Sequence, residues 1–183
     1  MPDRLHWYPA ALFGRLGIEP AYREWLLETG SLTAKIRQAC PEMHVTVLSE
    51  RWEVPLRFEA ERLKLADNRK AWVRCVLLKC GDEPLVYGRT VIPDCVPGNA
   101  WYRLRQLGNR PLGEILFQLP NVQRTPFEIA HTQSTDWPYL PEVEPARPVY
   151  ARQSAFTQNG DTLLLSEGFR VRPAGSPPSQ VLP

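Results

Sequence analysis

The 183-residue sequence lacks the features that mark several large classes of protein. No stretch approaches the ~20 apolar residues of a transmembrane helix, and the first nine residues, MPDRLHWYP, lack the apolar core of a signal peptide. The 22 basic and 20 acidic residues give a formal net charge of only +2, which does not favour a nucleic-acid partner. We therefore expect a soluble, cytoplasmic protein with no stable membrane insertion.

Residues that commonly bind metals or cofactors are few and scattered. The three histidines show no metal-binding spacing, and the sequence has no glycine-rich nucleotide motif and no G-x-S-x-G motif. We expect no metal and no cofactor. The four cysteines form no C-x-x-C pair, so we interpret them as small core residues in a reducing compartment; they are Cys40, Cys75, Cys80 and Cys95.

Three apolar segments each contain a charge where the pattern predicts none. Glu167 lies in DTLLLSEGF, Arg74 in AWVRCVLLK and Arg89 in PLVYGRTVIP. A buried carboxylate is costly unless a cation or hydrogen-bond donor meets it, so a structural salt bridge between Glu167 and one arginine is one interpretation. The other is a ligand site, because two arginines and one carboxylate leave an excess of positive charge for an anion.

The same segments carry the strongest strand signals. Residues 71–80 and 85–92 are rich in β-forming residues and are separated by Gly-Asp-Glu-Pro, which predicts a hairpin. Counting with a period of two allows Arg74 and Arg89 to lie on the same side of the sheet. Further strands are expected at residues 44–49, 122–132, 149–157 and 163–169, and Asn159-Gly160 predicts a primed turn between the last two.

The remaining elements are short helices and loops. Ser31 can cap a helix over residues 32–39, Pro20 can begin one before it, and others are expected after Asn99 and Pro111. Residues 57–65 fit either a helix or a surface excursion. Hairpins and short helical connections predict an α+β single domain with an antiparallel sheet of about six strands. Residues 137–148 are expected to be a loop, and residues 171–183 a proline-rich, flexible tail.

Five segments, in order along residues 1–170, together resemble the chorismate pyruvate-lyase family. They are EWLLETGSLT from residue 24, WVRCVLL from 72, GRTVIP from 88, LGNRPLGEILF from 107 and LLLSEGF from 163. The resemblance implies that Leu32, Arg74, Leu112 and Glu167 contact the ligand, with Arg89 nearby, and that short helices form flaps over a buried site. Family members often have Met at the position of Leu32.

The resemblance also implies a reaction, the elimination of pyruvate from chorismate to give 4-hydroxybenzoate for ubiquinone synthesis, without metal or organic cofactor. We expect Arg74 to anchor the ring carboxylate, and Arg89 either to position Glu167 or to face the enolpyruvyl group. Glu167 would bind the ring hydroxyl and could assist proton movement. Intramolecular hydrogen transfer is the alternative, and strong product inhibition is expected.

Two other functions are less favoured by the sequence. The same fold resembles the ligand-sensing domains of some bacterial transcription regulators, but only about 20 residues precede the first helix, fewer than a DNA-binding helical module needs. Nucleic-acid binding through Arg103, Arg105 and Arg110 is weaker, because arginines scattered on one helix usually form a solvated face. We expect a monomer.

Overall fold

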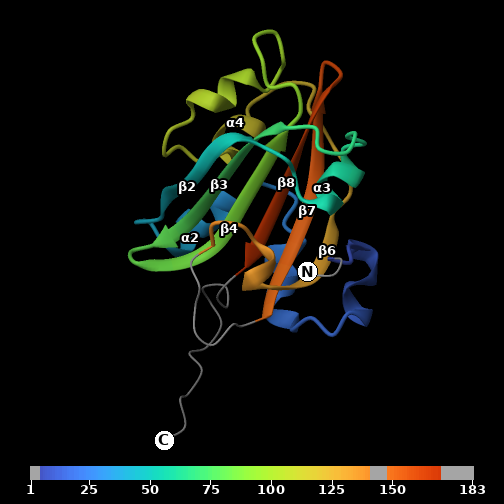
Figure 1. Ribbon diagram of the computed structural model, residues 1–183. Coiled ribbons are helices and arrows are strands. Elements are labelled where there is room, and N and C mark those ends of the chain that lie inside the picture. Colours follow the sequence, from blue (N-terminus) through green and yellow to red (C-terminus); the bar gives the residue numbers. More distant parts are fainter. Residues whose placement is uncertain (1–4, 141–147, 170–183) are drawn as a thin grey trace, which may run out of the picture.

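One antiparallel sheet organises the chain (Figure 1). The computed structural model describes residues 5–140 and 148–169. The strand order is β1-β6-β7-β8-β4-β3-β2, with β5 paired to β7, which confirms the α+β prediction and the antiparallel sheet. There are eight strands where about six were predicted, and the two extra ones have two residues each. The strands are β1 (Tyr8–Pro9), β2 (His44–Glu53), β3 (Ala71–Cys80), β4 (Glu83–Ile92), β5 (Gln123–Arg124), β6 (Glu128–Gln133), β7 (Pro148–Gln158) and β8 (Asp161–Phe169).

The β7–β8 hairpin forms as the sequence predicts. Asn159 and Gly160 have φ angles of 51° and 88°, the left-handed values that a primed two-residue turn requires. Pairing continues without a shift from Gln158 opposite Asp161 to Tyr150 opposite Phe169. The turn therefore sets which side chains of the two strands face one another.

The β3–β4 hairpin contains a bulge that overturns one expectation. Next to the turn, Cys80 pairs with Glu83, but the register shifts by one residue between Leu78 and Lys79. Beyond the shift Arg74 lies opposite Thr90, whereas Arg89 lies opposite Cys75. Because neighbouring residues of a strand point to opposite faces, the prediction that both arginines share one side of the sheet is wrong.

The helices are short, and several begin where the sequence indicates. Ser31 caps α2, since its Oγ accepts a hydrogen bond from the backbone N–H of Ala34 at 3.2 Å. The segment that begins at Pro20 forms a 3₁₀ turn followed by one α-helical turn, and the segment after Asn99 is 3₁₀. The α-helices are α1 (Arg23–Leu26), α2 (Leu32–Ala39), α3 (Arg57–Arg62) and α4 (Gly113–Leu116), and the 3₁₀ helices are η1 (Ala10–Arg15), η2 (Pro20–Tyr22), η3 (Tyr102–Gln106) and η4 (Ser134–Asp136).

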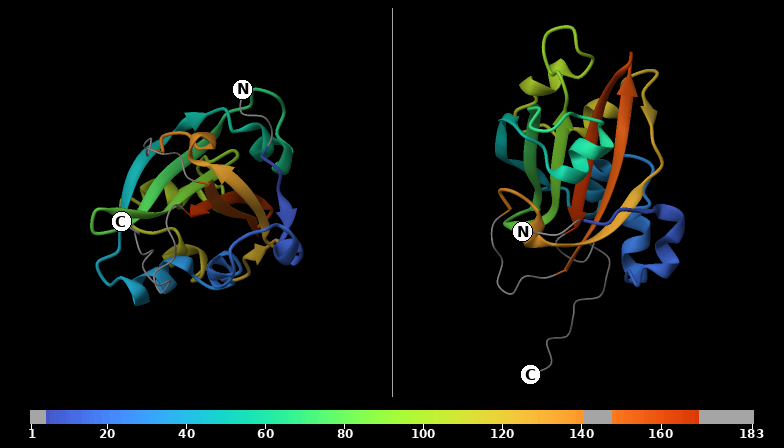
Figure 2. Two further views of the ribbon diagram at one scale, coloured as in Figure 1. Left: turned by 90° about the horizontal axis from the view of Figure 1, so that it is seen from below. Right: turned by 45° about the vertical axis from the view of Figure 1, so that its right-hand side comes forward.

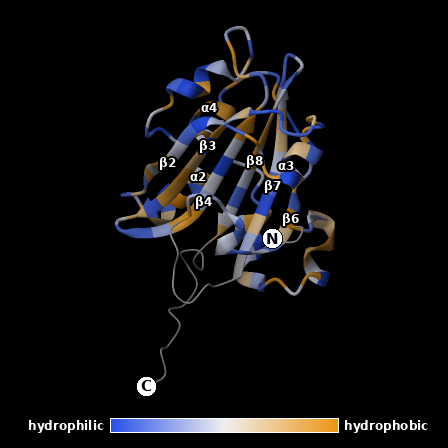
Figure 3. Ribbon diagram, in the orientation of Figure 1, coloured by the Kyte–Doolittle hydropathy of each residue, from blue (hydrophilic) through white to orange (hydrophobic). Residues whose placement is uncertain are grey.

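The curved sheet has helices on both faces, and α2 and α3 lie on opposite sides of it (Figure 2, left). On the face toward α2, an apolar cluster includes Ile36, Val86 and Phe169. The face toward α3 packs a second cluster around Tyr87 and Trp137. Figure 3 shows hydrophobic residues concentrated along the strands and on α4. Both faces of the central strands are therefore buried, which explains their nearly continuous apolar sequences.

The cysteine prediction is wrong for two of the four residues. Cys40, directly after α2, forms a disulfide with Cys80 at the end of β3, with their Cα atoms 6.1 Å apart. Cys75 and Cys95 are free and buried, as expected for small core residues. The disulfide joins the C-terminal end of α2 to the sheet.

Two predictions fall partly or wholly outside the described residues. These are the tail at 171–183 and most of the loop at 137–148, of which residues 141–147 are not described. Among the helices of the described residues, none has the length and apolar character needed to cross a bilayer.

Candidate active site

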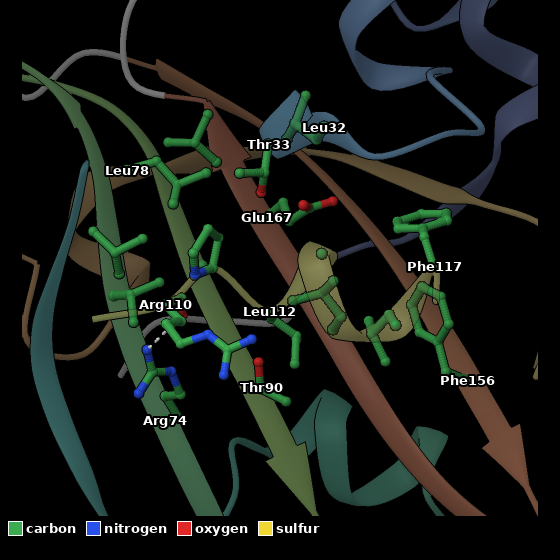
Figure 4. Close-up of a pocket in the computed structure, with 18 of the residues that line it drawn as sticks. Leu32, Thr33, Arg74, Leu78, Thr90, Arg110, Leu112, Phe117, Phe156 and Glu167 are labelled. Carbon is green, nitrogen blue, oxygen red and sulfur yellow. Dashed lines mark hydrogen bonds between the residues drawn. The ribbon is translucent and has the colours of Figure 1, made fainter. Parts of the chain in front are cut away.

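A pocket lies between the sheet and the helices α2 and α4 (Figure 4). Its floor includes Val76, Gly88, Thr90 and Leu165 from three adjacent strands, all on the same face of the sheet. Gly88 lies directly opposite Glu167 and contributes no side chain, which leaves space beside the carboxylate. The empty space, open mouth included, is ≈ 610 Å³.

Four of the five residues singled out in the sequence line this pocket. Arg74 and Glu167 reach it from β3 and β8, while Leu32 and Leu112 lie at the start of the two helices that cover it. Leu32 is buried, and Leu112 is partly buried. The structure therefore brings together two charged groups and two apolar groups from segments far apart in the sequence.

Arg74 is held at one end of the pocket. Its side chain is only 3% exposed, and its Nη2 donates hydrogen bonds to the carbonyl oxygens of Gly108 at 2.7 Å and Arg110 at 3.4 Å. Its Nη1 forms an ion pair with Glu50 of β2. Arg110 also lines this end (Figure 4), and its own side chain has no ion-pair partner among the described residues. An oriented guanidinium beside a second cation suits a carboxylate ligand.

Glu167 pairs with a residue that the sequence interpretation missed. Its Oε2 accepts a hydrogen bond from Arg152 Nε at 2.5 Å, and Arg152 lies directly opposite it on β7. Arg152 Nη1 also donates to the carbonyl oxygens of Trp25 at 3.1 Å and Glu28 at 2.7 Å, where α1 ends. No described residue donates to the other carboxylate oxygen of Glu167, Oε1. That oxygen remains able to accept a hydrogen bond from a ligand.

Arg89 lies on the opposite face of the sheet and does not line the pocket. Its Nε and Nη2 donate to the two carboxylate oxygens of Glu59 in α3, at 2.7 and 3.0 Å, and its Nη1 donates to Glu53 at 2.9 Å. Burial raises the pKa of Glu59, and the facing Arg89 partly opposes this rise. Arg89 therefore neither pairs with Glu167 nor faces the ligand space, and its geometry is that of a structural ion pair.

Arg124 is a second pocket cation that the sequence interpretation missed. Its Nε donates to Ser154 Oγ at 2.9 Å and its Nη1 to the carbonyl oxygen of Thr29 at 3.1 Å. Burial, and then the nearby charge of Arg152, lower the pKa of Arg124 to about 10. The guanidinium carbon lies 4.0 Å from the ring centroid of Phe127, 4.8 Å from that of Phe156 and 5.9 Å from that of Phe117.

The two helices that cover the pocket contact each other. A Cβ atom on Gly113 would lie 2.9 Å from Ser31 Oγ and 3.2 Å from Thr33 Oγ1, so only glycine permits this close approach at the start of α4. Arg37 of α2 also forms an ion pair with Glu114 of α4. The two short helices thus lie over the pocket and are joined to each other, as expected for flaps.

One group of side chains in the described part of the chain has metal-ligand spacing, and it lies at the disulfide. Cys40, Glu42 and Cys80 offer ligand atoms within 4.8 Å of one another. Both sulfurs are engaged in the disulfide, and a sulfur in a disulfide is not the thiolate that binds metals. Neither Arg74 nor Glu167 belongs to this group.

Comparisons with known proteins point to one family. A family model described as Chorismate lyase matches residues 1–174. The chain is 52% identical over 166 residues to "Probable chorismate pyruvate-lyase" of Hydrogenovibrio crunogenus, covering 90% of this chain and 89% of that protein. It is 30% identical over 146 residues to "Chorismate pyruvate-lyase" of Pectobacterium atrosepticum, covering 80% and 75% respectively.

Among solved structures, the similarity concerns the fold. The C-terminal domain of the histidine utilization repressor from Pseudomonas syringae has a TM-score of 0.52 at 9% identity, covering 72% of this chain and 93% of that one. A GntR-family transcriptional regulator from Bacillus cereus has a TM-score of 0.50 at 9% identity, covering 78% and 99%. The fold is therefore shared with proteins of another class.

Proposed function

The chain belongs to the chorismate lyase family, and we propose that it eliminates pyruvate from chorismate in the pocket under α2 and α4, leaving 4-hydroxybenzoate. It is a lyase by this membership. The observation that carries the assignment to the pocket is the placement of Arg74 and Glu167 on one face of the sheet, beneath Leu32 and Leu112. Chorismate is a compact dianion with a ring carboxylate, a ring hydroxyl and an enolpyruvyl ether. The pocket offers groups suited to the ring carboxylate, the ring hydroxyl and the ring itself.

Each of these groups has a role in the proposal. Arg74, oriented by the Gly108 carbonyl and Glu50, binds the ring carboxylate. Glu167 accepts the ring hydroxyl through Oε1 while Arg152 holds Oε2. The side chains of Leu32 and Leu112 cover the ring and exclude water from the charged groups. Arg89 has no ligand contact in this assignment, because it lies on the other face of the sheet.

The reaction needs few groups from the protein. The ether bond between ring carbon and oxygen breaks, and the oxygen leaves with the electron pair as enolpyruvate. The hydrogen on the hydroxyl-bearing ring carbon leaves as a proton, the ring becomes aromatic, and the enolpyruvate takes up a proton on its methylene carbon to become pyruvate. Glu167 carries the ring proton, or the hydrogen passes directly to the methylene carbon while Glu167 only positions the hydroxyl.

The pathway, the location and the product inhibition of the enzyme belong to the same proposal. The product would enter ubiquinone synthesis, the enzyme would act in the cytoplasm, and 4-hydroxybenzoate would inhibit strongly because it keeps the ring, carboxylate and hydroxyl of the substrate. Residues 1–170 would form the catalytic unit.

Incubation of the purified protein with chorismate, in the presence of a metal chelator, tests the activity. We expect 4-hydroxybenzoate and pyruvate in equal amounts. Binding of chorismate without conversion would instead favour a non-catalytic sensing domain, the alternative that the shared fold leaves available.

A further inference from the structure

Arg124 is a pocket cation that the proposed roles leave unused. It lines the ligand space together with Phe156, which lies opposite it on β7. Its hydrogen bonds to Ser154 and Thr29 go to a neutral hydroxyl and a carbonyl, and no carboxylate forms an ion pair with it among the described residues. A partly buried cation held by neutral acceptors has its charge available for an anion.

The other cations of the pocket wall are compensated or lie elsewhere. Arg152 has Glu167 and backbone carbonyls as partners, and Arg74 has Glu50. Arg110 lies at the end of the pocket near Arg74, since its carbonyl oxygen accepts from that guanidinium. At the Glu167 end, Arg152 therefore forms the ion pair with Glu167, while no described carboxylate forms an ion pair with Arg124.

The position of Arg124 relative to Glu167 is set by the strand register. Arg124 Nε binds Ser154, which lies two residues from Arg152 along β7 and on the same face. Arg152 is directly opposite Glu167. Two residues along a strand span about 7 Å. The guanidinium of Arg124, at Ser154, therefore lies about this distance along the hairpin from the Arg152–Glu167 pair. Figure 4 shows its ring neighbours Phe117 and Phe156 on the far side of Glu167 from Arg74.

Chorismate has a group that matches this spacing. Its hydroxyl and its ether oxygen are on adjacent ring carbons, so a hydroxyl bound by Glu167 places the enolpyruvyl carboxylate at the same end of the ring. We propose that Arg124 binds this second carboxylate and holds the departing enolpyruvate. The inference rests on the proposed function, and it assigns to Arg124 the part of the substrate that Arg74 and Glu167 do not reach.

The contacts of Arg124 suit that role. Nε and Nη1 are occupied by Ser154 and Thr29, which leaves Nη2 to donate to a ligand oxygen. The ring of Phe127, 4.0 Å from the guanidinium carbon, restricts the orientation of the guanidinium group. Because negative charge grows on the enolpyruvyl group as the ether bond breaks, a fixed cation there stabilises the transition state more than the ground state. The aromatic product lacks this carboxylate.

The substitution Arg124→Gln tests the proposal, with Arg124→Lys as the conservative variant and Arg103→Gln as a control. Arg103 is exposed on η3 and lies outside the pocket, so its substitution removes one positive charge without changing the site. Two quantities are measured for each variant: kcat/KM for chorismate, and the dissociation constant of 4-hydroxybenzoate by calorimetry.

For Arg124→Gln we expect kcat/KM to fall at least about 30-fold, as when one partner of a buried charge pair is removed, with little change in 4-hydroxybenzoate affinity. Arg124→Lys should recover part of the loss, and Arg103→Gln should behave as wild type. Parallel losses for substrate and product, or no loss for the substrate, would overturn the role of Arg124 while leaving the lyase activity intact. A wild-type protein that does not convert chorismate would refute both proposals.

Discussion

Glu167 of β8 faces Arg152 of β7, with its Oε2 atom 2.5 Å from Arg152 Nε. The arginine is 1% exposed and also binds the carbonyl oxygens at the end of α1, among them that of Glu28. One guanidinium thus orients the carboxylate of the pocket and fixes the segment that leads into α2. The ion pair therefore links the pocket to the segment that leads into α2, one of the two helices that cover it.

Replacing Arg152 with Leu should therefore destabilise the fold. The change leaves Glu167 without its cation and the α1 carbonyls without a donor, and removing one partner of a buried ion pair costs about 3 to 5 kcal/mol. Urea unfolding measures the free energy of unfolding, and Arg152→Lys, which keeps the charge, should lose less. An Arg152→Leu protein as stable as wild type would contradict the structural role.

The Arg152–Glu167 pairing was available from the sequence, although the interpretation did not reach it. A two-residue turn at Asn159-Gly160 pairs Gln158 with Asp161, and counting outward from these two pairs residue 152 with residue 167. Arg152 itself follows the apolar residues Val149, Tyr150 and Ala151 but precedes the polar Gln153 and Ser154, so it is a weaker signal than Arg74 in its apolar run. Hairpins with short primed turns therefore allow side-chain partners to be predicted, because the turn fixes the register.

The β3–β4 hairpin shows why the same counting can fail. Near its turn Cys80 pairs with Glu83, and this register, if continued, would place Arg74 opposite Arg89. The bulge at Leu78 shifts every later pair by one residue and sends the two arginines to opposite faces. Nothing in the local sequence marks the bulge, since it depends on how both faces of the sheet pack.

Arg74 and Arg89 should consequently respond to substitution in opposite ways. Arg74→Gln should weaken 4-hydroxybenzoate binding at least about 30-fold, because it removes a buried charge partner of the ligand. Its effect on the free energy of unfolding should be smaller than that of an Arg89 substitution, since the side chain of its partner Glu50 is 30% exposed. Calorimetric titration and thermal unfolding of the same sample separate the two effects.

Arg89→Met should show the reverse pattern. It leaves Glu59 buried at 0% exposure without its cation, so we expect a loss of about 3 to 5 kcal/mol in the free energy of unfolding. The folded fraction should still bind 4-hydroxybenzoate with the affinity of the wild type. A selective loss of ligand affinity in this variant would show that the second face of the sheet takes part in the site.

The cover over the ring predicts slow product release. Leu112→Ala or Leu32→Ala removes apolar contact worth about 1.5 to 3 kcal/mol, and should weaken 4-hydroxybenzoate binding on the order of 10- to 100-fold. The first turnover should slow much less, because contacts shared by substrate and product do not lower the barrier. Rapid mixing of the wild type should show a burst of product followed by a slower steady rate. A linear time course with weak product inhibition would rule out slow product release.

The disulfide should contribute to stability. Cys40 and Cys80 are 40 residues apart in the sequence, and closing a loop of this length stabilises by about 3 to 5 kcal/mol in the chain-entropy model. Dithiothreitol should therefore lower the free energy of unfolding of the wild type but not that of Cys40→Ser. Equal sensitivity of both proteins to the reductant would show that the loss of stability does not come from this disulfide.

The sequence could not predict the bond between Cys40 and Cys80, because the two residues come close only after α2 has packed against the end of β3.

The charge of Glu167 can be tested without changing the shape of its side chain. Glu167→Gln keeps the size of the side chain and one accepting oxygen, so a carboxylate that moves a proton should show a loss of roughly 10²- to 10⁴-fold in the rate of the first turnover. A rate close to that of the wild type would mean that Glu167 positions the hydroxyl and that the hydrogen passes within the substrate.

The most direct test of the central claim, that this pocket is where pyruvate is eliminated, is a single-turnover experiment with enzyme in excess over chorismate. Wild type and the surface control Arg103→Gln should convert all substrate to equal amounts of 4-hydroxybenzoate and pyruvate, whereas Arg74→Gln should convert it far more slowly at the same enzyme concentration. Equal rates for all three proteins, or no conversion by the wild type, would contradict the account.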